Sequence, residues 1–302
     1  MGGCCCKRRE KEGRRCEGEI NRLLPTEMLE RVFRLLPNRD LVTVVQVCRR
    51  WRQVGESPIL WAWLRLPTVN EDNLNVISEL LQYSKRLQAL ESLVVRSVSE
   101  ELLAAIAQHK SLKRLDIANT NLFSVDPAVL AKSVCRMEKV DMGRSFFSPE
   151  QANAIFQSLA QGSNVNTLSL FNTNLSTVNP QLLASAVTKV SQITLWSSRL
   201  TIKQIEAIFQ ALTTPGKLRV LDLSYNNLST VSPRVLAVTV NSLESVDLGC
   251  TCLTGEQVNA ILSQALVATS LTSLWISGVK GEVNREAVVK AIKIIPGLRV
   301  LW

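Results

Sequence analysis

Three passages of nearly the same sequence recur 53 residues apart, and this repetition constrains the fold more than any other feature of the chain. They read NTNLFSVDPAVLAKSV from Asn119, NTNLSTVNPQLLASAV from Asn172 and NNLSTVSPRVLAVTV from Asn226. A second set of similar passages interleaves with them, beginning at Phe147, Leu200 and Leu253. Repetition at a fixed period predicts a solenoid, in which each unit buries its apolar face only against its neighbours.

Each unit contains an L-x-x-L-x-L pattern that predicts a strand. The steps between second anchors alternate between 25 and 28 residues and end with one of 27; these anchors are Leu115, Val140, Leu168, Ile193, Leu221, Val246, Leu274 and Leu301. The pattern resembles the leucine-rich-repeat family from about residue 85 to 302. The resemblance implies an α/β solenoid, with a curved parallel sheet lined on its outside by helices.

Members of that family usually carry Asn or Cys three residues after the last strand anchor, where the side chain satisfies buried backbone groups. Here the position holds mostly hydroxyl residues, which can do the same with fewer donors; they are Thr120, Ser145, Thr173, Ser198, Asn226 and Thr251, followed by Val279.

Capping signals predict where the helix of each unit begins. A side-chain oxygen precedes a proline suited to the first helical position at Asp126-Pro127, Ser148-Pro149, Asn179-Pro180 and Ser232-Pro233. Three pairs also fit a capping box: Ser148 with Gln151, Thr201 with Gln204 and Thr254 with Gln257.

Residues 20–66 differ in character and predict short amphipathic helices broken by prolines. Their motifs are Leu23-Leu24-Pro25-x-Glu27-x-Leu29, Val32-Phe33, Leu35-Leu36-Pro37, Asp40-Leu41, Val47-Cys48-Arg49-x-Trp51 and Pro58-x-Leu60-Trp61. In this order they resemble the F-box family along its whole length, which implies a small all-α module ahead of the solenoid of residues 67–302. The alternative is a simple N-terminal cap, since terminal repeats need one.

F-box segments dock on the Skp-type adaptor of Skp–cullin–F-box ubiquitin ligases, so the resemblance implies that adaptor and the cullin scaffold as partners. Carried over position by position, the apolar adaptor face comprises Leu24, Pro25, Leu29, Val32, Phe33, Leu41, Val44 and Val47. Some of these side chains must instead hold the helices together, and Trp51 and Trp61 are expected to be structural.

Because strand side chains alternate, residues between the buried anchors are expected on the concave face of the sheet. Neighbouring strands then place Phe171 beside Trp196 and Trp275 beside Trp302. Asp222 and Asp247 flank these two aromatic pairs. Exposed aromatic groups favour binding, so the six residues form the predicted site for an unknown protein substrate. The alternative is that a tail or neighbouring molecule covers them.

Composition argues against several other functions. The net charge is +9, but residues 67–302 contribute only 21 basic against 18 acidic side chains, without a basic stripe, so nucleic-acid binding is not expected. No stretch is apolar enough to span a membrane, and no signal peptide is recognisable, so we expect a cytoplasmic protein.

Cys250-x-Cys252 lacks a second ligand pair, and His109 is expected in a solvated loop. No enzyme activity, metal or cofactor is expected.

Two functions compete at this point. The first is a non-catalytic substrate receptor, in which the F-box recruits the adaptor and the concave face presents a protein to the ligase. The second is a membrane-tethered scaffold or inhibitor of the ribonuclease-inhibitor kind, in which the N-terminal helices only cap the solenoid. Binding of the adaptor distinguishes the two.

The first 19 residues form a basic tail, expected to be disordered, that carries candidate lipidation sites. Gly2 is in the acceptor position for N-myristoylation, although Cys6 replaces the usual Ser or Thr. One myristoyl chain binds membranes only marginally, so Cys4, Cys5 and Cys6 are the candidate palmitoylation sites that supply a second anchor. Six basic residues of the tail would face anionic lipid. The alternative is an unmodified basic tail or a weak nuclear-import signal.

Acylation would place the protein peripherally on the cytoplasmic face of a membrane. Metabolic labelling with an alkyne myristate is expected to mark the wild-type chain but not Gly2→Ala. An unlabelled wild-type chain would eliminate the myristoyl anchor, whatever the charge of the tail.

Overall fold

A computed structural model describes residues 23–66, 77, 80–82, 85–86 and 88–301. The chain divides into two compact units, Met1–Glu91 and Ser92–Trp302, which are described separately. None of the described helices is long and apolar enough to cross a membrane. The tail of residues 1–19 lies outside the described residues.

The described part of the first unit begins with a series of short helices and a short strand. They are α3 (Thr26–Arg34), α4 (Asn38–Val47), α5 (Arg49–Gly55), α6 (Pro58–Trp61) and β1 (Trp63–Arg65). Prolines set the boundaries, since Pro25 and Pro37 stand directly before α3 and α4, and Pro58 is the first residue of α6. Proline suits the start of a helix because its missing N–H would have no partner there.

The core of this unit forms around Trp61, which is fully buried. Its indole Nε1 donates to the carbonyl oxygen of Gly55 at 2.7 Å, so the polar edge of the ring is satisfied. A Cβ at Gly55 would lie 2.8 Å from a methyl group of Val45, so only glycine permits this approach of α5 to α4. Phe33 and Trp51 meet edge to face at 5.2 Å. Trp61 is therefore structural, as predicted, and Trp51 is half-buried beside Phe33.

The second unit alternates strands and helices. The strands are β2 (Ser92–Val94), β3 (Arg114–Asp116), β4 (Lys139–Asp141), β5 (Thr167–Ser169), β6 (Gln192–Thr194), β7 (Val220–Asp222), β8 (Ser245–Gly249), β9 (Ser273–Ser277) and β10 (Gly297–Leu301). The helices are α8 (Glu100–Ile106), α9 (Pro127–Cys135), α10 (Pro149–Gln161), α11 (Pro180–Val187), α12 (Ile202–Leu212), α13 (Pro233–Asn241), α14 (Gly255–Val267) and α15 (Arg285–Ile292).

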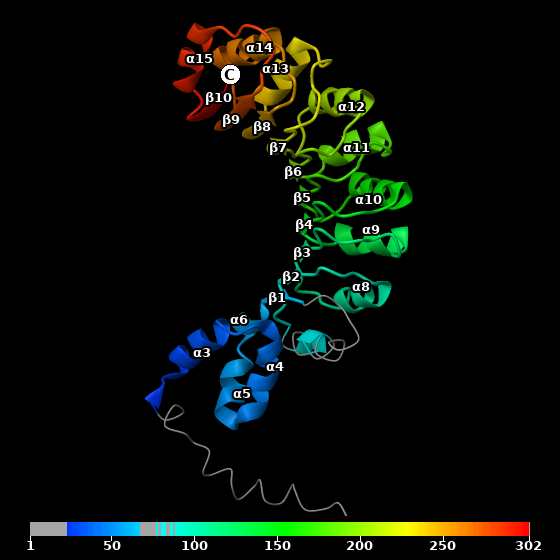
Figure 1. The fold of residues 1–302 in the computed structure, drawn as a ribbon, viewed down its shortest axis with the longest axis vertical. Coiled ribbons are helices and arrows are strands. Elements are labelled where there is room, and N and C mark those ends of the chain that lie inside the picture. The colour runs from blue at the N-terminus through cyan, green and yellow to red at the C-terminus, as the bar shows by residue number, and fades with distance from the viewer. Residues whose placement is uncertain (1–22, 67–76, 78–79, 83–84, 87, 302) are drawn as a thin grey trace, which may run out of the picture. The chain divides into compact units, whose positions relative to one another are not determined.

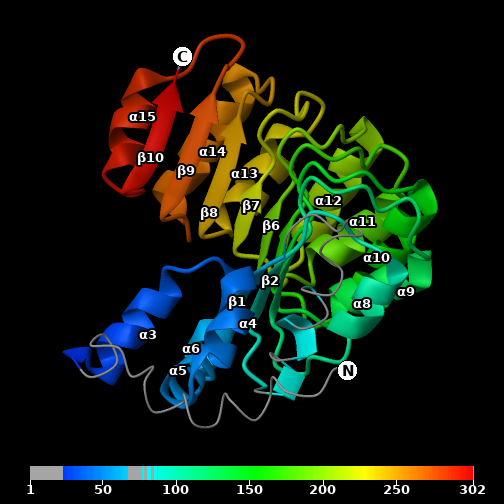
Figure 2. The ribbon, with the colours of Figure 1, turned by 60° about the horizontal axis from the view of Figure 1, so that its bottom comes forward.

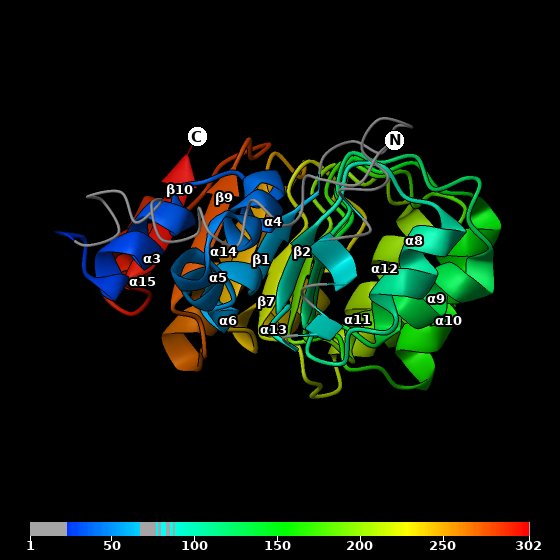
Figure 3. The same cartoon turned by 90° about the horizontal axis from the view of Figure 1, so that it is seen from below.

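Strands β2 to β10 are neighbours in chain order and pair in parallel. Within this unit they line the inner side of an arc, with the helices on the outer side (Figure 1). Figure 2 shows β8, β9 and β10 side by side and pointing the same way, and Figure 3 shows α8, α9 and α10 on the side away from β2. The α/β solenoid with a curved parallel sheet is therefore confirmed.

The predicted anchors form one buried row from Leu115 to Leu274, but the last predicted anchor is wrong. Leu274 pairs with Leu298, three residues before Leu301, and Trp275 pairs with Arg299. The last strand contains a second apolar alternation, Leu298 and Val300, which aligns with Leu274 and Ile276 and lets all five residues of β9 pair. The final step is therefore shorter than the sequence pattern predicted.

The hydroxyl groups after the strands satisfy buried carbonyl oxygens, as predicted. Thr120 and Ser145 both donate to the carbonyl oxygen of Ile117, at 2.6 and 2.7 Å. Thr173 and Ser198 share the carbonyl oxygen of Leu170 in the same way, at 2.6 and 2.8 Å. Thr251 donates to Leu248, and Asn226 donates to both Leu195 and Leu223. Two hydroxyl groups on one carbonyl thus link neighbouring repeats.

The three predicted capping boxes are all present. Asp126 and Asn179 also cap α9 and α11 with their side chains. The cap predicted for Ser232 is wrong, because its side chain makes no capping hydrogen bond to α13. The proline in the first turn and the packing of the apolar face suffice to start that helix.

The capping-box glutamines have a further role that the sequence pattern did not reveal. Gln204 is fully buried, and its Oε1 accepts from the backbone N–H of Thr201 at 2.8 Å. Its Nε2 reaches into the preceding repeat and donates to the carbonyl oxygens of Leu175 and Val178, at 2.7 Å each. Gln151 and Gln257 form the same three bonds one period earlier and later.

These glutamines join repeats in pairs. Their bonds connect the repeat of α10 to that of α9, α12 to α11, and α14 to α13. The helices of each pair also pack more extensively on one another than α10 does on α11 or α12 on α13. The paired repeat, and not the single repeat, is therefore the structural unit of the solenoid.

His109 is buried, with 3% of its surface exposed, so its predicted place in a solvated loop is wrong. Arg136 of the next repeat lies over this end of α8 and donates to the carbonyl oxygens of Ile106 and His109, at 3.1 and 2.8 Å. It also donates to the carbonyl of Ala107. The guanidinium thus adds donors to the carbonyl groups at this helix end.

Gln204→Ala is expected to lower the free energy of unfolding by about 3 kcal/mol, because it removes three hydrogen bonds, those with the N–H of Thr201 and with the carbonyl groups of buried Leu175 and Val178. Gln210→Ala is the matched control: Gln210 is exposed on the same helix, and its loss is expected to cost less than about 0.5 kcal/mol. Urea unfolding of the full chain measures both. Equal midpoints for the two variants would show that the inter-repeat bonds contribute nothing.

Candidate protein-interaction surfaces

Helix α3 is apolar on two faces. Leu29 and Phe33 face the core of the first unit and are each 1% exposed. Met28, Val32 and Leu35 are 43, 44 and 84% exposed, at the spacing that places side chains along one side of a helix. A solvent-facing apolar stripe beside a buried one is unusual for a helix of an isolated domain. The exposed face of α3 is therefore a candidate docking surface for a partner protein.

The structure separates the eight residues predicted for the adaptor face into two groups. Leu29, Phe33, Leu41 and Val44 are buried within the unit. Pro25, Val32 and Val47 are exposed, and Leu24 is half-buried. The sequence allowed for some of these residues to be structural but could not say which.

Exposed Met28 and Leu35 were missed, although their spacing from Val32 by four and three residues was a usable signal. Leu23, Ile59 and Trp63 are further exposed apolar side chains of the same unit, at 75, 51 and 60%.

The aromatic pair predicted on the strand side of the second unit is present. The rings of Phe171 and Trp196 stack with centroids 5.8 Å apart and planes at 24°. Tyr225 continues the row, edge to face with Trp196 at 5.9 Å, and the guanidinium of Arg144 lies 5.6 Å from the centre of the Phe171 ring. These four side chains form the aromatic cluster.

Glycine makes room for this cluster at Gly143. A Cβ there would lie 2.0 Å from the ring of Phe171, so any other residue would displace the ring. The ring therefore packs directly against the backbone of Gly143. Phe171 and Trp196 are half-buried, whereas Tyr225 is 61% exposed.

Sequence alternation missed Tyr225 because its backbone is left-handed, at φ 58°, in the turn that follows β7. A residue in that conformation directs its side chain away from the alternating positions of the strand. A row of such turn residues, which includes Arg144 at the same φ, follows the strands through the unit.

The aspartates predicted beside the aromatic groups also accept hydrogen bonds from the backbone of the turns that follow their strands. Asp222 Oδ1 accepts from the N–H and the hydroxyl of Ser224, at 3.0 and 2.6 Å, and Asp247 Oδ1 accepts from the N–H of Gly249 at 2.8 Å. The two lie opposite each other on β7 and β8. Burial raises the pKa of Asp247, and the negative charge of Asp222 adds to the increase.

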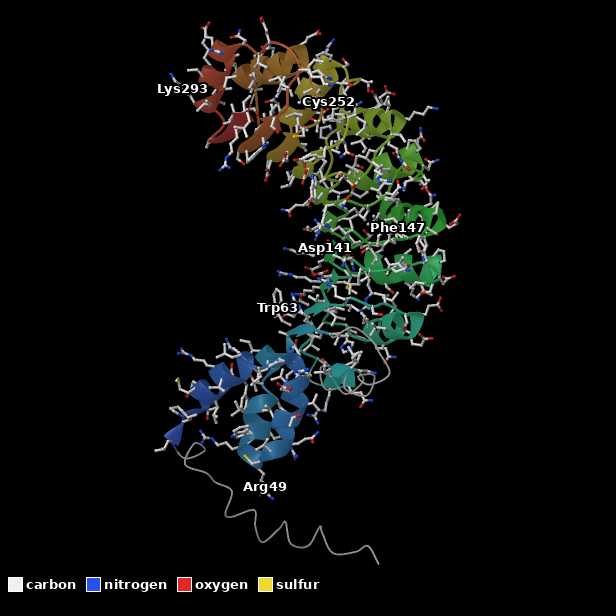
Figure 4. All side chains as sticks on the ribbon, viewed as in Figure 1. Arg49, Trp63, Asp141, Phe147, Cys252 and Lys293 are labelled. Atoms are coloured by element: carbon white, nitrogen blue, oxygen red, sulfur yellow. The ribbon has the colours of Figure 1, made fainter. Side chains whose placement is uncertain are left out.

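Asp116 and Asp141 bond their own turns in the same way, and Arg96 pairs with Asp116 at 2.7 Å. Figure 4 labels Asp141 on the strand side of the stack. We call these four aspartates, Asp116, Asp141, Asp222 and Asp247, the acidic column; they have a structural role at the strand ends in addition to their negative charge.

The register predicted for the last strand, which placed Trp302 beside Trp275, is wrong. Arg299 is the strand neighbour of Trp275, and its guanidinium lies 5.3 Å from the centre of the half-buried indole. Trp302 lies outside the described residues. The prediction failed because the last anchor is Leu298 and not Leu301. The candidate lipidation sites Gly2, Cys4, Cys5 and Cys6 also lie outside the described residues.

Comparison with known proteins supports the division into two kinds of module. Residues 22–67 match the F-box-like family model, and residues 217–238 match the leucine-rich-repeat model. No curated protein matches the chain significantly. Among solved structures, the crystal structure of a protein from Bacteroides fragilis is similar with a TM-score of 0.49 and 10% identity, over 79% of this chain and 73% of that one.

Both kinds of module typically bind proteins and are typically non-catalytic. The short helices with their solvent-facing apolar stripe lie within the F-box match, and the paired strands and helices continue on both sides of the repeat match. The chain therefore combines an F-box-like segment with a parallel strand-and-helix solenoid that contains a leucine-rich repeat.

Proposed function

We propose that this protein is the substrate-recognition subunit of a Skp–cullin–F-box ubiquitin ligase. The observation that carries the proposal is the exposed stripe of Met28, Val32 and Leu35 along α3 and its C-cap, beside a face that is already buried, within an F-box-like segment. A Skp-type adaptor would cover this stripe and connect the chain to the cullin.

The aromatic cluster is the proposed substrate-binding surface. Half-buried rings held in place by their neighbours lose little conformational entropy on binding, and aromatic side chains dominate the energy of many interfaces. Asp222, Asp247 and Trp275 extend the surface toward later strands. An extended segment with apolar anchors near Lys or Arg would match the rings and the acidic column.

The alternative function is a non-catalytic scaffold or inhibitor that does not take part in ubiquitination. It uses the same aromatic cluster but leaves the α3 stripe without an adaptor. Membrane tethering through Gly2 and the three following cysteines is compatible with either function. In both cases the proposed location is the cytoplasm or the cytoplasmic face of a membrane.

Val32→Glu is expected to weaken binding to a purified Skp-type adaptor at least about tenfold, because it places a charge in an apolar contact. Leu29→Arg is unsuited to this purpose, since Leu29 is buried and a charge there would destabilise the unit itself. Arg31→Glu is the matched control: it puts a carboxylate on an exposed position of the same helix beside the stripe.

Calorimetric titration of the full chain with adaptor measures these affinities. If the wild-type protein does not bind the adaptor, the ligase role is excluded and the scaffold function is favoured. Equal weakening by Val32→Glu and Arg31→Glu would show that charge, and not the apolar stripe, determines docking.

Trp196→Ala is expected to cost the binding of a substrate about 2 kcal/mol, with a melting temperature within a few degrees of wild type. Val289→Ala is the control, because it removes an exposed apolar side chain on α15, outside the cluster. Thermal melts and binding to a purified partner test both variants. Normal stability with unchanged binding would move the substrate site away from the aromatic cluster.

A further inference from the structure

A groove of about 640 Å³ runs along the edge of the second unit where strands β3 to β6 end. It is lined by the turn residues that follow these strands and by the loops that lead to the next helices. Its side chains of interest are Phe123, Arg144, Phe146, Asn172, Asn174 and Arg199. We call it the rim groove.

The lining of the rim groove is positively charged. Arg144 and Arg199 line it, and no acidic residue does. A neighbouring hollow of about 630 Å³ shares Thr177 with the groove, adds Lys203, and again has no acidic residue in its lining. Within the described part of the chain, no ion pair involves these three cations. The electrostatic complement of both hollows is therefore an anion.

Helix starts add to this potential. Pro149, the first residue of α10, lines the rim groove, and Pro180 and Ile202, the first residues of α11 and α12, line the second hollow. The N-terminus of a helix carries a partial positive charge. Glu150, directly after Pro149, is the acidic residue closest in sequence to the lining of the rim groove. It is exposed in the first turn of α10 and outside the lining of either hollow.

The groove also presents apolar surface on a fixed backbone. Phe123 and Phe146 are 59 and 62% exposed. The N–H of Phe146 donates to Thr120 and its carbonyl accepts from Leu122, at 2.9 and 2.8 Å, while the N–H of Phe123 donates to Asn121 Oδ1 at 3.1 Å. Figure 4 labels Phe147, the next lining residue, on the helix side of the stack. The two exposed rings are thus held on ordered loops.

We propose that the rim groove binds an acidic segment of a partner protein, with carboxylates on Arg144 and Arg199 and an apolar side chain against Phe123 and Phe146. Guanidinium groups bind carboxylates through two parallel hydrogen bonds, which fixes the register of the segment. The inference goes beyond the proposed function, because it holds whether or not the F-box-like unit binds an adaptor. Its preference for acidic segments is also opposite to that expected beside Asp222 and Asp247.

The test uses the full chain and a fluorescent twelve-residue peptide that alternates pairs of Glu with Leu or Phe. A second peptide replaces every Glu by Gln. Anisotropy is expected to show saturable binding of the acidic peptide, at least about tenfold weaker binding of the amide peptide, and weakening by added salt.

Arg144→Glu and Arg199→Glu are each expected to weaken the acidic peptide about tenfold or more. Arg234→Glu is the matched control: this exposed arginine lies in the first turn of α13, outside both hollows, and its reversal is expected to change affinity less than about twofold. Arg199→Gln gives a milder version of the same test. Circular dichroism verifies that each variant is folded.

Four results would each overturn the proposal. They are no saturable binding up to about 1 mM peptide, equal binding of the amide peptide, equal weakening by Arg234→Glu, and tighter binding of a single-stranded RNA of similar length through the same arginines. Adaptor titration of the same variants keeps the two proposals distinguishable, since neither arginine belongs to the F-box-like unit.

Discussion

The second unit depends on one buried side-chain amide that is repeated every 53 residues. At Gln151, Gln204 and Gln257 the amide closes the first turn of its own helix and satisfies two carbonyl groups of the preceding loop. Buried backbone groups without partners are costly, so a loop of this shape can be buried only if some side chain reaches it. Glutamine is long enough to do so and carries both a donor and an acceptor.

The same requirement explains the polar residues around the strand ends. Hydroxyl groups after the strands and aspartates on their exposed side each bond backbone groups of a turn. These hydroxyl groups and aspartates are therefore needed to stabilise the turns. Two other features of the strand side are not required by the fold. One is the row of rings from Phe171 to Tyr225, and the other is the exposed arginines at Arg144 and Arg199. The aromatic row and the two arginines are therefore the best candidates for binding a partner.

The sequence predicted what local chemistry determines and missed what depends on neighbouring repeats. Capping boxes followed from short spacings, the role of the hydroxyl groups after the strands followed from the family resemblance, and Phe171 beside Trp196 followed from strand alternation. The bonds from each glutamine Nε2 go to a loop that lies far from it in sequence, so no local spacing predicts them. Tyr225 was missed because alternation does not extend into a left-handed turn. The α3 stripe could not be separated from the core-facing residues until burial was known.

The pairing of repeats also determines the order in which parts of this solenoid would unfold. If α9 with α10, α11 with α12 and α13 with α14 each form a tightly joined pair, the weaker boundaries lie between α10 and α11 and between α12 and α13. Local opening follows the least stabilised boundaries first, and solenoids distribute stability over their interfaces. The cooperative folding unit would then span two repeats, and stretching or partial unfolding would release the chain in segments of about two repeats rather than one at a time.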